Sequence, residues 1–267
     1  MSDPVIFQQG DTPLLVSFPH DGTDIPPEIE ARMTDAVLAR PDTDWHVARL
    51  YEFVAELGAS TLRPRSSRYV VDLNRDPSGN VLYPGADNTG LVPTTTFDQQ
   101  PIYRPGCEPD ANEIAARIER WFSPYHAKLE REIERLLARH GIAVVFDAHS
   151  IRSQVPRFFD GVLPDLNLGT ASGTSADDAL ASRAFNVLAS SREYSAVRDA
   201  RFKGGFITRH YGEPARGVHA LQLELSQKNY MHETPPYDFD EPRANALRSL
   251  LRRFVGELLE FARQGSR

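Results

Sequence analysis

Four runs of apolar residues have the length of β-strands, and segments with apolar residues at helical spacing lie between them. The runs cover residues 13–20 (PLLVSFPH), 68–74 (RYVVDLN), 142–149 (IAVVFDAH) and 220–226 (ALQLELS). The helical segments cover residues 44–58, 110–141, 175–191 and 241–264. This alternation predicts an α/β protein with helices on both faces of a mainly parallel or mixed sheet.

Residues with strong positional preferences refine this prediction. Pro124 is expected to break or kink the long second helix, and Ser175 is a suitable N-cap for the third. The connecting stretches 76–109 and 151–172 are longer than usual, and such loops commonly form a binding rim or a lid. We find no internal repeat and no low-complexity linker, so we expect residues 1–267 to form one domain.

Composition restricts the possible functions of the protein more than it restricts the possible folds. The chain has 267 residues, of which 40% are hydrophobic and 25% charged, as in ordinary globular proteins. A single cysteine, Cys107, excludes an internal disulfide framework and a cysteine-based zinc site. The formal charge of -7 argues against nucleic acid as a partner, although a few arginines could still hold a small anionic substrate in a cleft. Since the sequence shows neither a signal segment nor a membrane span, we expect a cytoplasmic protein with no membrane partner.

Polar groups stand where the apolar runs end. The four runs deliver, in chain order, His20 with Asp21, then Asp72 with Asn74 and Arg75, then Asp147 with His149, and finally Glu224. Ligands of open α/β sheets gather beyond the carboxyl ends of the strands. We therefore expect these side chains to meet at one edge of the sheet.

Each of these residues also has a purely structural interpretation. A histidine that ends a strand commonly makes a structural hydrogen bond, and Glu224 would equally suit an edge strand. Two imidazoles that each lie beside an acid nevertheless favour a divalent metal site, with Glu224 as the base for a water molecule. Asp147 could orient an imidazole by a hydrogen bond. The pair Asn74–Arg75 either caps a turn or recognises a planar carboxylate.

The third metal ligand is open at this stage. Asp44 begins the helical segment 44–58, where an aspartate can also cap free backbone amides without any metal. Other acids compete with it: Asp21, Asp24 and Asp42. Arg209 and His210 lie in a glycine-flanked segment that either wraps a ligand or marks a turn.

Taken together, six motifs resemble the N-formylglutamate amidohydrolase (N-formylglutamate deformylase) family. They are FPHDGTDIP, DTDW, RYVVDLNR, FDAHS, GGFITRHYG and LQLELS, in that order, between about residues 13 and 226. The resemblance implies a three-layer αβα fold similar to that of zinc carboxypeptidases and aspartoacylase-like deacylases. It also implies hydrolysis of N-formyl-L-glutamate to L-glutamate and formate in histidine breakdown.

The resemblance also implies roles for particular residues. His20 and His149 match metal ligands, Glu224 matches the general base, and Asn74 with Arg75 matches the pair that holds a substrate carboxylate.

The chain departs from the wider metallohydrolase pattern at the middle metal ligand. Carboxypeptidases have a glutamate three residues after the first histidine, and this chain has Thr23 there. We therefore choose Asp44 as the carboxylate ligand, ahead of Asp21 and Asp24.

The expected chemistry is metal-assisted amide hydrolysis with Glu224 and Arg75 as catalytic residues. Zinc is the expected ion, and manganese, cobalt, nickel or iron would also suit these ligands. Since the substrate has two carboxylates, further cations are expected in loops near the site, with His210 beside them: Arg104, Arg152 and Arg209.

Three other functions remain possible. The chain could be a deacylase or peptidase acting on another N-acyl amino acid, or a non-catalytic ligand-binding relative. A serine hydrolase that uses Ser150 is disfavoured, because DAHS lacks the glycine-flanked elbow that exposes a nucleophilic serine.

Overall fold

A seven-stranded mixed sheet forms the centre of the protein. The computed structural model describes residues 3–81, 85 and 87–265. In spatial order, the strands are β1 (Val5–Gln8), β3 (Ser60–Pro64), β2 (Leu14–Ser17), β4 (Ala143–Ile151), β7 (Val218–Ser226), β5 (Leu166–Gly169) and β6 (Ala196–Arg198). The pairings β2–β3, β2–β4, β4–β7 and β5–β6 are parallel, whereas β1–β3 and β5–β7 are antiparallel. The predicted mixed, largely parallel α/β sheet is confirmed.

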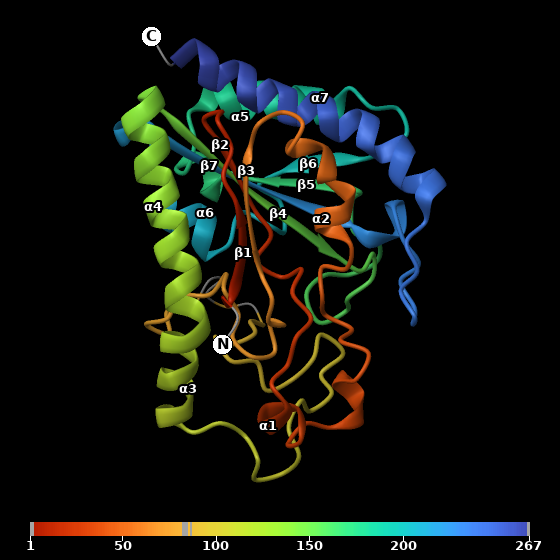
Figure 1. The fold of residues 1–267 in the computed structure, drawn as a ribbon. Helices are drawn as coiled ribbons and strands as arrows, with labels where there is room; N and C mark the ends of the chain where they lie inside the picture. Colours follow the sequence, from red (N-terminus) through yellow and green to blue (C-terminus); the bar gives the residue numbers. More distant parts are fainter. Residues whose placement is uncertain (1–2, 82–84, 86, 266–267) are drawn as a thin grey trace.

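Helices cover both faces of this sheet (Figure 1). One face packs against α2 (Val47–Leu50), α5 (Asp178–Ala189) and α7 (Glu241–Gly265). The other packs against α3 (Ala111–Arg117), α4 (Ser123–His140) and α6 (Phe206–Tyr211). A short helix, α1 (Pro27–Glu30), lies among the long connections at one end of the sheet. The arrangement has three layers, αβα.

The central strands are buried on both sides, which explains their continuous apolar runs. Every residue of β4 and β7 is buried. Along β4, Val144 and Phe146 contribute to the core under α7, while Ala143 and Val145 contribute to the core under α4. Among the described residues, no helix is both long and apolar enough to cross a membrane.

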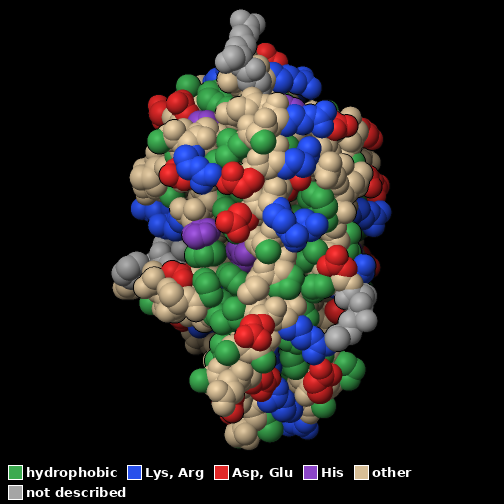
Figure 2. Space-filling model, turned by 60° about the vertical axis from the view of Figure 1, so that its left-hand side comes forward, with side chains coloured by type: hydrophobic (Ala, Val, Ile, Leu, Met, Phe, Trp, Pro, Cys, Tyr) green, Lys and Arg blue, Asp and Glu red, His purple; other side chains and the backbone are tan. Residues whose placement is uncertain are grey.

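Charged side chains of both signs are intermixed with apolar ones across the face shown in Figure 2. On this face, neither sign of charge is gathered into one large patch.

The long helical segment is interrupted just before Pro124, by a π-helical turn at Ile118–Phe122. Proline lacks an N–H group, and its ring would clash with the carbonyl four residues earlier in a regular α-helix. A π turn widens the helix there, so the predicted break takes this form and α4 continues beyond it.

The prediction of a strand at residues 68–74 was wrong. This segment is a buried, irregular loop, and the strand beside β2 is instead β3, which the apolar pattern did not indicate. The sequence also did not indicate β1, β5 and β6, which have only four, four and three residues. Because β5 lies inside the stretch 151–172, that stretch is less irregular than expected.

Three local predictions also need correction. The segment 44–58 forms only the short α2 and a 3-10 turn, because His46 has a left-handed backbone conformation with φ of 61° and prevents an earlier start. The N-cap of α5 is Asp177, whose side chain accepts from the Ala179 amide, whereas Ser175 donates to the Ala220 carbonyl. The glycine-flanked segment around Arg209 is helix α6 rather than a loop. Within the predicted rim 76–109, residues 82–84 and 86 lie outside the described residues.

Candidate active site

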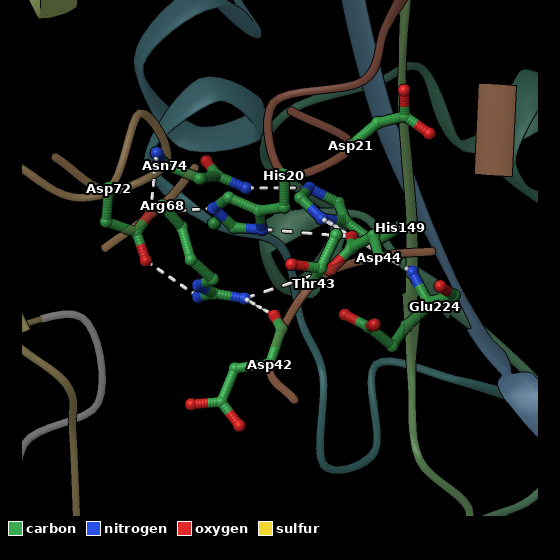
Figure 3. Close-up of polar contacts among 12 residues, drawn as sticks. His20, Asp21, Asp42, Thr43, Asp44, Arg68, Asp72, Asn74, His149 and Glu224 are labelled. Carbon is green, nitrogen blue, oxygen red and sulfur yellow. Dashed lines mark hydrogen bonds and ion pairs between the residues drawn. The ribbon is translucent and has the colours of Figure 1, made fainter. Parts of the chain in front are cut away.

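Three buried side chains could hold a metal ion at the end of the central strands. His20 follows β2, His149 lies near the end of β4, and Asp44 precedes α2 (Figure 3). One donor atom of each lies within 4.8 Å of the donor atoms of the other two. Because β2 and β4 are parallel neighbours, their carboxyl ends bring the two histidines together, and the ring centroids are 4.9 Å apart.

Carboxylates fix the orientation of both imidazole rings. His20 Nε2 lies 2.7 Å from Asp72 Oδ1, and His149 Nε2 lies 2.9 Å from Asp147 Oδ2. The Nδ1 atoms instead face Asp44 Oδ2, at 3.8 Å for His20 and 3.0 Å for His149. Two imidazole nitrogens and one carboxylate oxygen, with each ring held from behind by an acid, suit a divalent ion such as zinc.

Asp44 lies beside His20 and His149, and the three competing acids do not. Its Oδ2 accepts from the Ser150 backbone amide and faces His149, so it is not occupied in capping α2. Asp21 instead pairs with Arg63 and accepts from the Ala48 amide, while Asp42 accepts from the Phe97 amide. Asp24 joins Ser66 in a backbone bridge and is exposed.

The electrostatics of the three residues differ. Burial lowers the pKa of His20, and the Arg68 guanidinium lowers it further, which favours the neutral imidazole. For His149, burial also disfavours the charge, but Asp147 and Asp44 outweigh it and raise the pKa well above its usual value. Burial alone would raise the pKa of Asp44, yet the hydrogen bond from His149 and the nearby imidazoles of His20 and His149 lower it. Asp44 therefore remains a carboxylate, and an ion bound here would replace the proton on His149, since metal binding requires a carboxylate and neutral imidazoles.

Glu224 lies beside this group on the neighbouring strand. In the β4–β7 register it is directly opposite His149, and its side chain is buried. Burial and the nearby Asp44 charge raise the pKa of Glu224 to about 8, although His149 acts in the opposite direction. A carboxyl group with a raised pKa in a cavity is suited to general acid–base catalysis.

These side chains open onto a narrow cavity of about 70 Å³. Besides the three candidate ligands and Glu224, the described residues that line it include two arginines and three aromatic rings: Arg68, Arg75, Phe97, Phe158 and Phe202. The cavity thus combines positive charge with an apolar wall.

Arg68 is buried in an acidic environment that the sequence did not reveal. Its Nη2 donates to Asp72 Oδ2 at 2.7 Å, and its Nη1 lies 3.8 Å from Asp44 Oδ1. The guanidinium carbon is 4.9 Å from the centre of the Phe97 ring. The arginine therefore lies close to both a candidate ligand and the acid that orients His20.

The loop at residues 68–74, which carries Arg68 and Asp72, is held in place by side chains from α3 and α4. Arg117 Nη1 donates to the Val70 carbonyl at 3.0 Å, and His126 Nε2 lies 2.9 Å from the Leu73 carbonyl. In a regular α-helix, residues nine apart point in roughly opposite directions. The π turn between Arg117 and His126 adds about one residue and rotates their relative direction by roughly 100°, so both reach the loop.

A family model described as N-formylglutamate amidohydrolase matches residues 12–231. The chain belongs to this family. It is 48% identical over 264 residues to an N-formylglutamate deformylase of Pseudomonas aeruginosa, covering 99% of each chain. It is 45% identical over 253 residues to an N-formylglutamate deformylase of Pseudomonas putida, covering 95% of this chain and 94% of that one.

Two solved structures are similar in fold. The N-formylglutamate amidohydrolase of Ralstonia eutropha JMP134 has a TM-score of 0.83 and 26% identity, over 99% of this chain and 100% of that one. A gene product of Agrobacterium tumefaciens has a TM-score of 0.75 and 18% identity, over 97% and 96% of the two chains. The latter supports the fold alone.

The remaining predicted site residues fall into two groups, those that line the cavity and those that lie elsewhere. Arg75 lines the cavity, and so does Asn74. The Asn74 side chain, however, donates to Asp147 and accepts from the Ile207 amide, so protein groups already use both ends of it. The Asn74 side chain therefore supports its protein neighbours and is not open to bind a ligand.

The other predicted cations lie outside the described lining of the cavity. Arg209 and His210 are exposed in the last turn of α6 and line a separate hollow with Asp76. Arg104 is exposed on the surface, and Arg152 pairs with Asp98. Sequence reasoning missed Arg68 and Gln222, which do line the cavity. The two-residue period of β7, which places Gln222 on the same side as Glu224, was the available signal for Gln222.

Proposed function

We propose that the protein hydrolyses the formamide bond of N-formyl-L-glutamate, using a divalent ion, preferably zinc, held by His20, Asp44 and His149. The observation that carries the proposal is the buried group of two imidazoles and a carboxylate beside Glu224, in one cavity. The names of the two Pseudomonas relatives support the choice of substrate. In this proposal the chain acts as one cytoplasmic metallohydrolase domain, at a step of histidine breakdown that releases formate.

Glu224 is the proposed proton carrier. Bound by His20, Asp44 and His149, a divalent ion would polarise the formyl carbonyl and make an attacking water more acidic. In its carboxylate form, which the positive charge of a bound ion would favour, Glu224 accepts a proton from that water as the oxygen attacks the formyl carbon. The carbon–nitrogen bond then breaks, and the same carboxyl group passes the proton to the departing amine. Formate and L-glutamate leave the cavity.

Arginines in and near the cavity are the proposed counterions of the substrate. Arg75 is 18% exposed and lines the cavity, and hydrogen bonds to Thr89 and to the Asn74 carbonyl fix its guanidinium, whose charge can pair with a substrate carboxylate. Arg68 is only 6% exposed and already pairs with Asp72, so its part is to supply positive potential near the scissile bond. Asn74 keeps the neighbouring His149–Asp147 pair in place.

The small cavity also suits a small acyl group. Phe97, Phe158 and Phe202 form an apolar wall around a space of about 70 Å³. Exclusion of one extra methylene by size is worth only about 1–3 kcal/mol. We therefore expect N-acetyl-L-glutamate to react more slowly than the formyl compound rather than not at all.

Formate release from N-formyl-L-glutamate is the decisive experiment. Metal-stripped protein should be inactive, and adding back zinc, manganese, cobalt, nickel or iron(II) singly should restore activity with at least one of them. Full activity without any metal would overturn the metal-dependent mechanism. Preference for an N-acetyl or N-succinyl amino acid in a parallel panel would overturn the substrate and favour another deacylase.

A further inference from the structure

Gln222 connects Glu224 to the start of helix α6. It lies two residues before Glu224 on β7, is only 4% exposed, and lines the same cavity. Its Oε1 accepts from the Gly205 backbone amide at 2.7 Å, and its Nε2 donates to Glu224 Oε2 at 3.3 Å. The side chain therefore bridges a fixed backbone group and the proposed base.

The backbone amide determines which way the Gln222 side chain faces. A backbone N–H can only donate, so the atom near Gly205 must be the carbonyl oxygen of Gln222. The NH2 group is consequently directed at Glu224, and a flipped side chain would place two donors against each other. The hydrogen-bond network thus assigns Gln222 as a donor to the carboxylate.

Gly205 is itself fixed from the opposite side. A Cβ atom at this position would lie 2.3 Å from Asn74 Nδ2, so the backbone passes directly over the Asn74 side chain. Asn74 in turn donates to Asp147 Oδ2, which lies 2.9 Å from His149 Nε2. The contacts thus run without interruption from the proposed base to a candidate metal ligand.

We propose that Gln222 is a positioning residue for Glu224: it holds Oε2, so that Oε1 faces the cavity and takes the proton of the attacking water. This inference rests on the proposed function. It requires that loss of the amide slows the proton transfer and leaves substrate binding unchanged, because Gln222 acts through Glu224.

The first test is the substitution Gln222→Met, which keeps length and burial but removes both hydrogen bonds. Misplacement of a reacting group by about 1 Å can cost on the order of 10²-fold in rate. We therefore expect kcat for formate release to fall by about 10²-fold, with KM and the metal content of the purified protein unchanged. A raised KM at normal kcat would show instead that Gln222 binds substrate, and would overturn the proposal.

Gln222→Glu is the second variant, in case the first does not fold. It is nearly isosteric and keeps an acceptor for the Gly205 amide, but two carboxyl groups at this distance share one proton, so Glu224 loses both its fixed NH2 donor and its full charge. The proposal predicts a similar fall in kcat. Normal kcat in this variant would overturn it.

A double-mutant cycle separates positioning from a general structural effect. In a Glu224→Gln background, Gln222→Met should cause almost no further loss, because the group that it positions is already disabled. The matched control is Gln227→Met, since Gln227 is equally buried at the end of β7 but donates to the Thr43 carbonyl and Ser150. Its effect should simply add to that of Glu224→Gln. If the effect of Gln222→Met also adds, the positioning role is wrong.

The wild-type assay distinguishes the two levels of inference. An inactive wild type with its metal restored would overturn the proposed function and, with it, the role of Gln222. An active wild type with an equally active Gln222→Met variant would overturn the positioning role alone.

Discussion

Replacement of His126 by phenylalanine should remove one definite contribution to the acid sensitivity of this fold. His126 is 8% exposed, and its ring stacks on Phe122 at a centroid distance of 4.0 Å. A carbonyl oxygen can only accept, so Nε2 carries the proton that is donated to Leu73, and Nδ1 accepts from the Tyr211 hydroxyl. Burial lowers the pKa of His126 from 6.5 to about 4, which keeps the ring neutral in the folded protein.

The direction in which stability changes with pH follows from proton binding at His126 in the folded and unfolded states. Between about pH 6.5 and pH 4, the unfolded chain binds a proton at His126 and the folded protein does not. The stability contributed by the neutral ring is therefore complete above pH 6.5 and is lost as the pH falls towards 4. At about 1.4 kcal/mol for each pKa unit, the loss over this interval amounts to about 3 kcal/mol.

His126→Phe keeps an aromatic ring but can neither bind a proton nor donate to Leu73. At pH 7 the variant should be less stable by about 1–3 kcal/mol, because the buried Leu73 carbonyl loses its donor. Near pH 4 this difference should vanish or reverse, since only the wild type has lost the proton-linked contribution. Urea unfolding monitored by fluorescence at several pH values measures both effects.

His126→Gln is the matched control for the hydrogen bond. Its side-chain amide can reach the Leu73 carbonyl, so it should recover stability at pH 7 while showing the same weak pH dependence as phenylalanine. A constant difference between wild type and His126→Phe at every pH would refute the reasoning, because it would mean that His126 does not remain neutral in the fold.

Three further predictions concern the site. Glu224→Gln should lower kcat by about 10²–10⁴-fold while elemental analysis finds the metal content unchanged; lost metal would make Glu224 a ligand. His149→Ala should lose bound metal, and retention of one equivalent would exclude it as a ligand. Gly205→Ala should lower the free energy of unfolding by about 1–3 kcal/mol, because the new Cβ would lie 2.3 Å from the Asn74 amide. In the same urea assay, Gly256→Ala on α7 meets no atom within 4 Å and should be neutral or stabilising.

The apolar runs in the sequence were sufficient to predict the central strands, because the burial of these strands is visible in their own residues. β4 and β7 are long and buried on both faces, so they appear as uninterrupted apolar runs. The edge strands β1 and β6 have only four and three residues, and their pairing depends on a neighbour far away in the chain. Too few residues alternate in such strands for a period to be detected.

The loop at 68–74 was mistaken for a strand for a different physical reason. Its apolar residues are buried as in a strand, but its backbone groups are paired with distant partners instead of a sheet neighbour. Arg117 and His126 donate to its carbonyls, and its Asp72 amide donates to the Leu91 carbonyl. Burial of irregular backbone requires such partners, and a local apolar pattern does not show whether they exist.

Asp44 shows where sequence reasoning about a site reaches its limit. Parallel strand ends made it predictable that His20 and His149 would meet, because that argument needs only the topology of the sheet. The choice among four nearby acids depends instead on single backbone angles. The left-handed conformation of His46 starts α2 three residues later than the apolar pattern predicts, and Asp44 is therefore free of a capping role and turns towards His149. Arg68 is the same case: its buried charge is tolerable only because Asp72 and Asp44 converge on it, and that convergence exists only once the loop has folded.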